Sequence, residues 1–380
     1  MKESMTKIAA QPIRELSLNE RRLIELVFRN KKLARVTLSK EVDMTGASVT
    51  RLIAGLMELD LFSEEATKDG GRGQPKKMLS LNRDRFCSVG AFVYANRFRA
   101  VLVNFDGKVL RKWSQDVDEI SPTSVVSSLR LAADNLVNSR EAKKRVFLGI
   151  GLGVPVNFGT YGSSLQAHET FRKLDGAAVQ NALYEVGNFP VYLENDGTAA
   201  ALGEYLFGDQ KEHSLFMLHI GYGLGGGAVL NGRPFRGHNG NACLPGSLFP
   251  YGGERPTLQD LVDWVHGKGI NEEEALFGPN RLNANDPVLQ PWLSRASTQL
   301  EDAVRIVTGM FDPPVIVLGG PLPHDYLKDI AKRLTASDVK GPSRGLSVAT
   351  VIATSQGDLN GPIGAASIPF FRLFFPGSKT

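Results

Sequence analysis

The sequence predicts an α/β protein that joins a small helical head to a larger body of strands and helices. Three helix-forming segments and two short strands fall within residues 1–85, in the order of a winged helix-turn-helix. Apolar strand-like runs alternate with helical segments over residues 86–380, as they do in α/β folds. A glycine-rich stretch at residues 219–230 separates two apolar runs in the middle of this body.

The composition is that of an ordinary globular protein, with 42% hydrophobic and 22% charged residues among 380. No run of about 18 apolar residues occurs, so we expect no membrane span and no membrane partner. The first residues lack the apolar core of a secretory signal. Two cysteines, Cys87 and Cys243, fit a reducing compartment and exclude a four-cysteine zinc site. We therefore expect a cytoplasmic protein with free thiols.

The head has clear helix signals. Ser17 and Glu20 form a capping box that opens a helix reaching about Asn30. A short helix is predicted over residues 36–42, which Thr37 can cap, and Thr45 can cap a third helix over residues 46–59. The tight turn between the second and third helices predicts a helix-turn-helix.

The last helix of the head and the following hairpin predict a surface for double-stranded DNA. Small and hydrogen-bonding residues at the start of that helix can approach base edges. Strands at residues 61–65 and 78–81 form a wing with a basic tip at residues 68–77. Residues 1–85 hold 17 basic and 12 acidic residues, whereas the remainder holds 27 and 28, so the positive charge lies in the head. The candidate DNA contacts are Thr37, Ala47, Ser48, Thr50, Arg51, Arg72, Lys76 and Lys77.

Two other interpretations of the head stay open. The three helices can serve protein interaction instead of DNA binding. For each lysine of the wing taken singly, a position in a solvated loop is the preferred interpretation over a phosphate contact.

The body predicts alternating elements in chain order. Strands are expected at residues 88–93, 99–104, 108–113, 146–155, 191–193, 314–318 and 347–352. Helices are expected at residues 123–140, 176–186, 258–265, 271–275, 292–308 and 324–334, and a last helix opens at Gly361.

One strand of the body ends at Glu194, Asn195 and Asp196, where a helix begins. A carboxylate near a helix N-terminus is stabilised in its ionised form. At a strand end it can act as a base for a substrate hydroxyl. The segment alone supports an N-cap aspartate equally well.

The glycine-rich stretch has five glycines within residues 221–227. Such a stretch can bring backbone N–H groups to a phosphate, or it can simply form a tight hairpin. His219 fits a plain strand residue and His238 a surface loop, and we prefer these interpretations to a ligand role.

Taken together, the order of motifs resembles the ROK family (repressor, open reading frame, kinase). After the winged head come Gly-Val-Pro, Glu-Asn-Asp, the Gly-x-Gly-x-Gly-Gly-Gly hairpin, Asn-Gly-x-Ala, Val-Leu-Gly-Gly and Gly-Ala-Ala. The resemblance implies an actin/hexokinase-like (ribonuclease H-like) ATPase-type body of two lobes, residues 86–195 with the C-terminal helix and residues 196–360. The kinases of this family bind a sugar and ATP, and its repressors bind DNA and a sugar or sugar derivative. A homodimer or homotetramer is also implied.

The phosphate-binding turn of the family has the form Asp-x-Gly-Gly-Thr, and the aligned segment of this chain lacks its aspartate and both glycines. Phe92, Tyr94 and Asn96 stand in the aligned segment, residues 92–96. We therefore expect that ATP and Mg²⁺ do not bind in the kinase manner and that the chain is not an enzyme. Only if ATP binds would the family's nucleotide contacts fall on Gly223, Gly225, Gly226, Gly319 and Gly320.

The sugar and zinc motifs of the family also differ. In the Ala-Gly-Glu-x-Gly-His segment, Leu244 replaces the glutamate and Ser247 replaces the histidine. The zinc cluster that should follow is replaced by residues 252–256. Because zinc needs about four ligands, mostly thiolate and imidazole, we expect no zinc and no other metal, and Cys243 has a packing role.

The resemblance implies that Asn195 and Asp196 contact the ligand, and it implies the same less strongly for Asn157 and Asn239. Asp196 matches the catalytic base of the kinases, but without a phosphate donor we expect a hydrogen-bond acceptor for a sugar hydroxyl and no catalysis. The predicted function is a DNA-binding transcription regulator, a repressor, that responds to a sugar or sugar derivative. The alternatives are a sugar kinase with an added DNA-binding domain and a constitutive DNA-binding protein whose body only dimerises.

Overall fold

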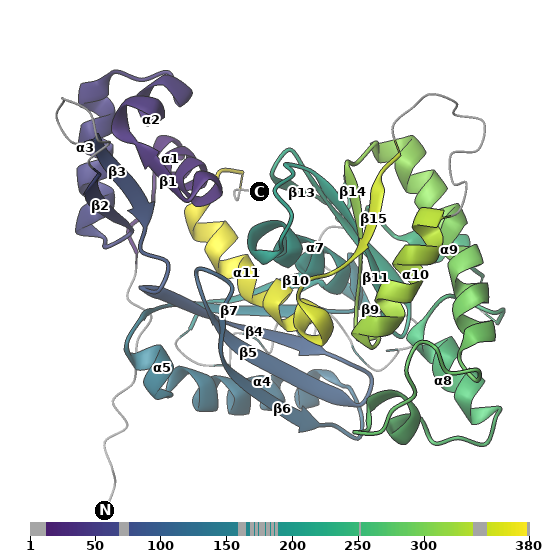
Figure 1. The fold of residues 1–380 in the computed structure, drawn as a ribbon. Helices are drawn as coiled ribbons and strands as arrows, with labels where there is room; N and C mark the ends of the chain where they lie inside the picture. Colours follow the sequence, from purple (N-terminus) through teal and green to yellow (C-terminus); the bar gives the residue numbers. More distant parts are fainter. Residues whose placement is uncertain are drawn as a thin grey trace, which may run out of the picture.

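The computed structural model describes residues 13–67, 76–158, 165–167, 189–250, 252–336 and 348–377, together with positions 171, 174, 179, 183 and 186. Within these residues a small head of helices and a short sheet stands against a body of two lobes (Figure 1). No helix in the described part of the chain has the length and apolar character to span a membrane.

The head contains the three predicted helices and the wing. Its elements are α1 (Leu18–Asn30), β1 (Lys32–Ala34), α2 (Arg35–Glu41), α3 (Gly46–Glu58), β2 (Phe62–Thr67) and β3 (Lys76–Leu81). The capping box of Ser17 and Glu20 is confirmed, and Thr45 accepts a hydrogen bond from the backbone of Ser48 as expected. The expected cap of the second helix is wrong, because α2 starts at Arg35 after the N-cap Ala34 and Thr37 lies inside its first turn.

The two lobes each contain a five-stranded sheet with the same strand order. The first sheet has the order β10-β7-β4-β5-β6 and the second the order β15-β14-β11-β12-β13. In each sheet a central strand pairs antiparallel with the next strand and parallel with a later one. The strands are β4 (Phe86–Val93), β5 (Arg97–Asn104), β6 (Val109–Asp116), β7 (Val146–Val154), β10 (Val191–Asn195), β11 (Leu215–Ile220), β12 (Leu224–Leu230), β13 (Arg233–Phe235), β14 (Val315–Gly319) and β15 (Thr350–Ala353).

A layer of two helices, α7 and α11, separates the sheets (Figure 1). The outer face of the first sheet is covered by α4, and that of the second by α9 and α10. A smaller pair, β8 (Val156–Phe158) and β9 (Leu165–Ala167), lies apart from both sheets. The helices are α4 (Pro122–Val137), α5 (Arg140–Lys143), α7 (Asp196–Phe207), α8 (Leu258–His266), α9 (Gln290–Phe311), α10 (His324–Ala336) and α11 (Asn360–Phe374), with short turns at Pro245–Leu248, Glu273–Phe277 and Gly357–Leu359.

Glycines let the middle layer approach both sheets closely. A methyl group at Gly90 or Gly151 would collide with the backbone of α11, and one at Gly197 would collide with the backbone of β12. The two helices also cross at Gly203 and Gly364, where neither has room for a side chain. This contact of backbone on backbone makes α7 and α11 the rigid centre of the body.

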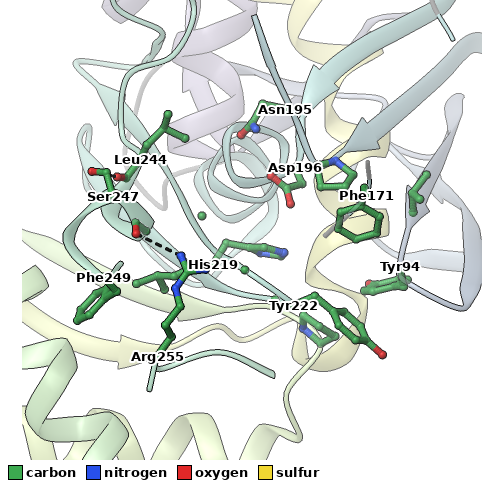
Figure 2. Close-up of a pocket in the computed structure, with 18 of the residues that line it drawn as sticks. Tyr94, Phe171, Asn195, Asp196, His219, Tyr222, Leu244, Ser247, Phe249 and Arg255 are labelled. Atoms are coloured by element: carbon green, nitrogen blue, oxygen red, sulfur yellow. Dashed lines mark hydrogen bonds between the residues drawn. The ribbon is translucent and has the colours of Figure 1, made fainter. Parts of the chain in front are cut away.

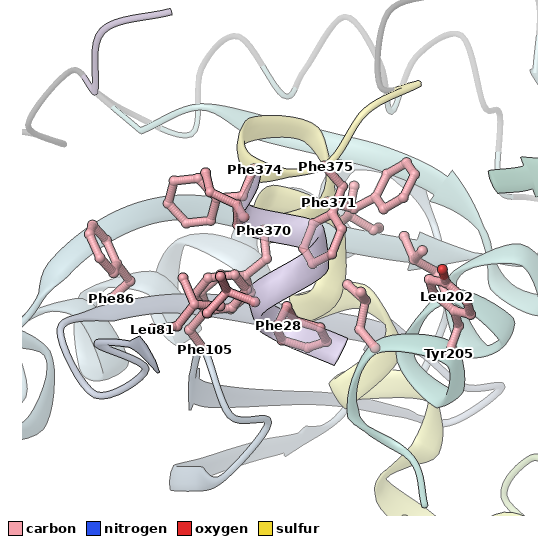
Figure 3. Close-up of a cluster of buried hydrophobic side chains, with 14 of the residues drawn as sticks. Phe28, Leu81, Phe86, Phe105, Leu202, Tyr205, Phe370, Phe371, Phe374 and Phe375 are labelled. Atoms are coloured by element: carbon pink, nitrogen blue, oxygen red, sulfur yellow. The ribbon is translucent and has the colours of Figure 1, made fainter. Parts of the chain in front are cut away.

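The end of α11 joins the body to the head. Phe28 of α1 contacts Phe105 of the first lobe and Phe375 after α11, with ring centroids 5.4 and 5.2 Å apart. Arg21 donates to the carbonyl oxygen of Arg372 at 2.9 Å. Figure 3 shows these rings in one cluster with the remaining phenylalanines of α11. A displacement of α11 would therefore move residues that are in direct contact with α1, the first helix of the head.

Two predicted helices differ in detail. The helix expected over residues 123–140 ends at Val137, because Ser139 caps the separate helix α5. The helix expected at residues 271–275 is a single π-helical turn at Glu273–Phe277. The helix expected at residues 176–186 lies largely outside the described residues.

Candidate ligand-binding site

A cavity of about 320 Å³ lies between the lobes, a volume that suits a small molecule. One wall consists of the ends of β4, β10 and α7, and the other of the glycine hairpin and the segment that follows it (Figure 2). The lining is formed by Phe92, Val93, Tyr94, Pro155, Phe171, Asn195, Asp196, His219, Gly221, Tyr222, Gly223, Leu224, Gly225, Leu244, Gly246, Ser247, Phe249, Pro250, Arg255 and Pro321.

Asp196 enters this cavity from the first turn of α7. The predicted alternative, an N-cap aspartate, is wrong because Asn195 is the N-cap and accepts from the backbone N–H of Thr198. The Asp196 carboxylate accepts from the N–H of Gly197 at 2.8 Å. Burial nevertheless raises the pKa of Asp196 from 3.8 to about 6. The expected stabilisation of the ionised form by the helix terminus is therefore outweighed by desolvation, and the carboxylate is a strong acceptor near neutral pH.

Asn195 also lines the cavity, but its amide already has two partners. Its Oδ1 caps α7, and its Nδ2 donates to the carbonyl oxygen of Val156 at 2.9 Å. The adjacent Glu194 is buried and forms an ion pair with Arg236. These bonds fix the backbone that presents Asp196 to the cavity.

His219 lies in the middle of the cavity wall, on β11. Only 2% of its surface is exposed, and its Nδ1 has no hydrogen-bond partner. Burial lowers the pKa of His219 from 6.5 to about 4, so the imidazole is neutral at physiological pH. His219 is a strand residue as the sequence indicated, but the preferred interpretation missed its place in the cavity.

Aromatic rings occupy the segment that the resemblance aligned with a phosphate-binding turn. Phe92 and Tyr94 are both buried and stand 5.1 Å apart, and Phe92 also lies 5.6 Å from the ring of His219. The turn is closed by a hydrogen bond from the N–H of Tyr94 to the oxygen of Arg97. Burial strongly raises the pKa of Tyr94, so its hydroxyl stays protonated. No carboxylate or glycine of the family turn stands here, so these residues do not fit a nucleotide phosphate with its magnesium ion.

The glycine hairpin forms the opposite wall, and its antiparallel pairing runs from Leu215 to Val229. The N–H of Gly221 donates to the oxygen of Gly223 at 2.9 Å. Of the five predicted nucleotide contacts, Gly223 and Gly225 line the cavity. The other three, Gly226, Gly319 and Gly320, pack instead against Cys243, Asn360 and Ile220 respectively, and are not in the cavity lining.

The segment after the hairpin completes the cavity. Leu244 and Ser247 line it, as the alignment predicted; Leu244 precedes a short turn at Pro245–Leu248 and Ser247 lies within that turn. Arg255 reaches the same wall and donates to the oxygen of Gly246 at 3.2 Å. Arg255 belongs to the segment at residues 252–256, and its contact with the cavity was not predicted.

The other predicted ligand and metal positions are less informative. Asn239 is exposed and does not belong to the cavity lining. The backbone of Asn157 is in β8, and its side chain lies outside the described residues. Among the described residues, no group of three or more histidines, cysteines or carboxylates could hold a metal ion. The absence of zinc stays a prediction.

The structure gathers most of the predicted DNA contacts on the head. Thr37, Ala47, Thr50 and Arg51 are exposed, and Ser48 is half-buried with its hydroxyl 3.0 Å from that of Thr45. Lys77 is exposed at the base of the wing and lies 3.3 Å from Glu64. Arg72 and the side chain of Lys76 lie outside the described residues.

Comparisons with known proteins agree with the motifs. Residues 93–247 match the sequence model of the ROK family. An uncharacterized protein of Sinorhizobium fredii, y4fQ, is 42% identical over 96% of this chain and 93% of its own length. The xylose repressor of Caldicellulosiruptor bescii is 28% identical over 59% of this chain and 57% of the repressor. The match thus spans less than two thirds of the xylose repressor.

The fold has a close counterpart among solved structures. A ROK family transcriptional regulator, a homologue of the Escherichia coli MLC protein, superposes with a TM-score of 0.69 over 93% of this chain and 95% of that one, at 22% identity. This similarity confirms the predicted fold class, a winged head followed by a two-lobed body of the actin/hexokinase type.

Proposed function

We propose that this chain, which belongs to the ROK family, is a DNA-binding transcription repressor controlled by a sugar or sugar derivative. One observation carries the proposal: a single chain combines an exposed helix-turn-helix with a cavity between the lobes at Asp196. The relatives described as xylose repressors support the same combination.

In this proposal the head binds DNA through the first turns of α3. Ala47, Thr50 and Arg51 face solvent there, the half-buried Ser48 lies among them, and Thr37 lies on the neighbouring α2. A helix-turn-helix places such residues against base edges in the major groove. Two copies of the chain would bind two half-sites about one helical turn apart.

The effector binds in the cavity, and we infer that ATP does not. Asp196 offers an acceptor for a sugar hydroxyl, while Phe92 and Tyr94 fill the wall where a kinase would present backbone to phosphates. The proposal therefore includes no zinc, no magnesium and no catalytic step.

Signal transfer would run along α11. Gly361, in its first turn, touches Phe92 at the cavity, and Phe375, just after its last turn, packs on Phe28 of the head. A ligand that binds one lobe arrangement better shifts the population toward it, by no more than its difference in affinity. A tenfold difference corresponds to about 1.4 kcal/mol, which is enough to change repression when the two states are close in energy.

A sugar kinase with a DNA-binding head is the second candidate. Asp196 and the intact glycine hairpin favour it. Under that alternative, Asp196 would be the base for the phosphorylated hydroxyl.

A coupled ATPase assay of the full chain with a panel of monosaccharides and glycosides separates the two candidates. We expect no sugar-dependent ATP turnover, together with a thermal shift for at least one carbohydrate that Asp196→Asn removes. Asp209→Asn, at an exposed position beyond α7, is the matched control and should keep that shift. Turnover abolished by Asp196→Asn but kept by Asp209→Asn would establish the kinase.

A further inference from the structure

His219 has no evident structural reason to be a histidine. Every other side chain of β11 (Leu215–Ile220) is apolar, and all six positions are buried. Its ring contacts Phe92, and no carboxylate or carbonyl of the described residues accepts from Nδ1. An unsatisfied buried polar group typically costs about 1–3 kcal/mol. A phenylalanine or leucine would avoid that penalty, so the histidine requires another explanation.

The position of the imidazole in the cavity lining supplies one. A methyl group at Gly225 would lie 3.6 Å from Asp196 Oδ1 and 3.9 Å from His219 Cβ, and one at Gly221 would lie 3.7 Å from His219 Nε2. The two glycines thus keep clear the space beside both polar side chains. Figure 2 shows the imidazole and the Asp196 carboxylate directed into the same part of the cavity.

A neutral imidazole complements the carboxylate chemically. One of its nitrogens donates and the other accepts, whereas the ionised carboxylate only accepts. Vicinal hydroxyl groups, each a donor and an acceptor, satisfy such a pair. A phosphate or carboxylate would instead face repulsion from Asp196 at this end of the cavity.

The rest of the cavity is mostly apolar. Tyr94, Phe171, Tyr222 and Phe249 present aromatic rings, and Leu244 stands where the family has a sugar-binding glutamate. A free hexose carries hydroxyls on every side and would leave several of them without partners against these rings. Aromatic faces suit an apolar group or the C–H face of a ring.

We infer that His219 and Asp196 together bind a diol of the effector, and that the effector is a glycoside or deoxy sugar whose apolar substituent packs on the neighbouring aromatic rings. This inference rests on the proposed function, since it names the kind of sugar derivative that the same cavity takes.

Calorimetric titration of the full chain tests it with matched ligands. The probes are free glucose, galactose and xylose, their methyl and phenyl β-glycosides, and their deoxy analogues. We expect at least one phenyl glycoside or deoxy sugar to bind ten or more times more tightly than its parent sugar. Equal or tighter binding of the free sugars would overturn the inference while leaving a sugar-responsive regulator intact. Failure of every carbohydrate to bind would overturn both.

Variants of His219, one of the two residues assigned to the diol, sharpen the test. His219→Phe removes the hydrogen-bonding nitrogens at similar size and should weaken the best ligand tenfold or more, with unfolding stability kept or raised. His238→Phe, at an exposed position outside the cavity, should leave affinity unchanged.

Two further variants keep the inference testable if His219→Phe fails to fold. His219→Asn keeps a polar group and should retain part of the affinity. Tyr222→Ala should weaken the binding of phenyl glycosides more than that of free sugars. Unchanged affinity in His219→Phe, or equal losses for both ligand types in Tyr222→Ala, would contradict the assignment.

Discussion

The two lobes share one strand order, but the hairpins that face each other across the cavity are built differently. In the first lobe β4 and β5 meet at a turn flanked by Phe92 and Tyr94, whose rings fill the wall. In the second lobe β11 and β12 meet at Gly221 and Gly223, where backbone forms part of the wall between the side chains of His219 and Tyr222. The same topology therefore supports a turn lined by bulky rings on one side and a glycine-rich turn with open backbone on the other.

This difference bears on function. A nucleotide triphosphate needs main-chain donors and a metal-binding carboxylate around its phosphates. The hairpin of the first lobe presents the rings of Phe92 and Tyr94 at the cavity, and its turn at residues 94–96 holds no carboxylate. Polar groups and aromatic rings therefore lie side by side in the cavity, which suits a small amphipathic ligand.

Glycines within the second hairpin should be far less tolerant of change than those in its turn. A side chain at Gly227 would collide with the backbone of Gly197 in α7, whereas one at Gly221 meets nothing closer than 3.6 Å. We expect Gly227→Val to destabilise the fold by more than about 4 kcal/mol or to prevent folding, as overpacking against backbone does in severe cases. Gly221→Ala should cost less than about 1 kcal/mol. Urea unfolding monitored by circular dichroism measures both, and similar losses would refute the distinction.

In the first hairpin, stability depends on the volume that the buried ring of Phe92 fills. Phe92 is 2% exposed and fills the space beside Gly153 and Gly361. We expect Phe92→Ala to lower the free energy of unfolding by about 3–5 kcal/mol, the usual range for a buried phenylalanine. Phe235→Ala, at a partly exposed ring on the edge strand β13, serves as the control and should cost much less. A loss below about 1 kcal/mol for Phe92→Ala would show that the ring does not support the wall.

The ionised Asp196 should lower the free energy of unfolding near neutral pH, although it contributes to ligand binding. Its pKa in the folded chain is about 6 against 3.8 for the free group, so the folded state binds the proton more tightly than the unfolded state. This group's contribution to stability therefore falls as pH rises from about 4 to 6 and stays low above that. We expect Asp196→Asn to be about 1–3 kcal/mol more stable than the parent chain at pH 7.5, with a smaller gain at pH 5.

The same variant should bind the effector at least tenfold more weakly. Chemical unfolding at the two pH values, paired with calorimetry, measures both effects. A variant that is less stable at pH 7.5, or whose gain grows toward pH 5, would disagree with a buried, ionised carboxylate.

The smallest effect is expected at the rim of the first hairpin. Arg99 lies over the ring of Tyr94 at 5.4 Å and pairs with the exposed Asp358 at 3.1 Å. Such exposed ion pairs and cation–π contacts each contribute about 1 kcal/mol or less. We expect Arg99→Ala to reduce the free energy of unfolding by less than about 1 kcal/mol, and Arg99→Lys by even less. A loss above about 2 kcal/mol in thermal or urea unfolding would mean that Arg99 holds the turn in place.

Local signals predicted most of the fold. The capping box at Ser17, the cap at Thr45 and the apolar runs of the sheets gave the elements almost at their observed positions. Motif order placed Leu244 and Ser247 in the cavity, as observed. These features depend on residues close together in the chain or on a series of motifs.

Contacts between residues far apart in the chain could not be predicted from these local signals. His219 resembled any strand residue because its place in the cavity wall is set by residues far away in the chain, such as Phe92, whose ring it contacts. The contact of Phe28 with Phe375 joins the two ends of the chain and has no local pattern. The pKa of Asp196 depends on burial in the folded chain, whereas the sequence revealed only its helix terminus.

Sugar-dependent DNA binding tests the central claim most directly. The full chain would be used to enrich double-stranded fragments from a random library, and the enriched DNA would then be titrated by fluorescence anisotropy with and without each carbohydrate. We predict one or more sites whose affinity changes at least tenfold with one sugar derivative. The response should disappear in Asp196→Asn, and DNA binding itself should disappear in Arg51→Ala. Enriched DNA whose affinity is indifferent to every carbohydrate, or a chain that selects no DNA at all, would contradict a sugar-controlled regulator.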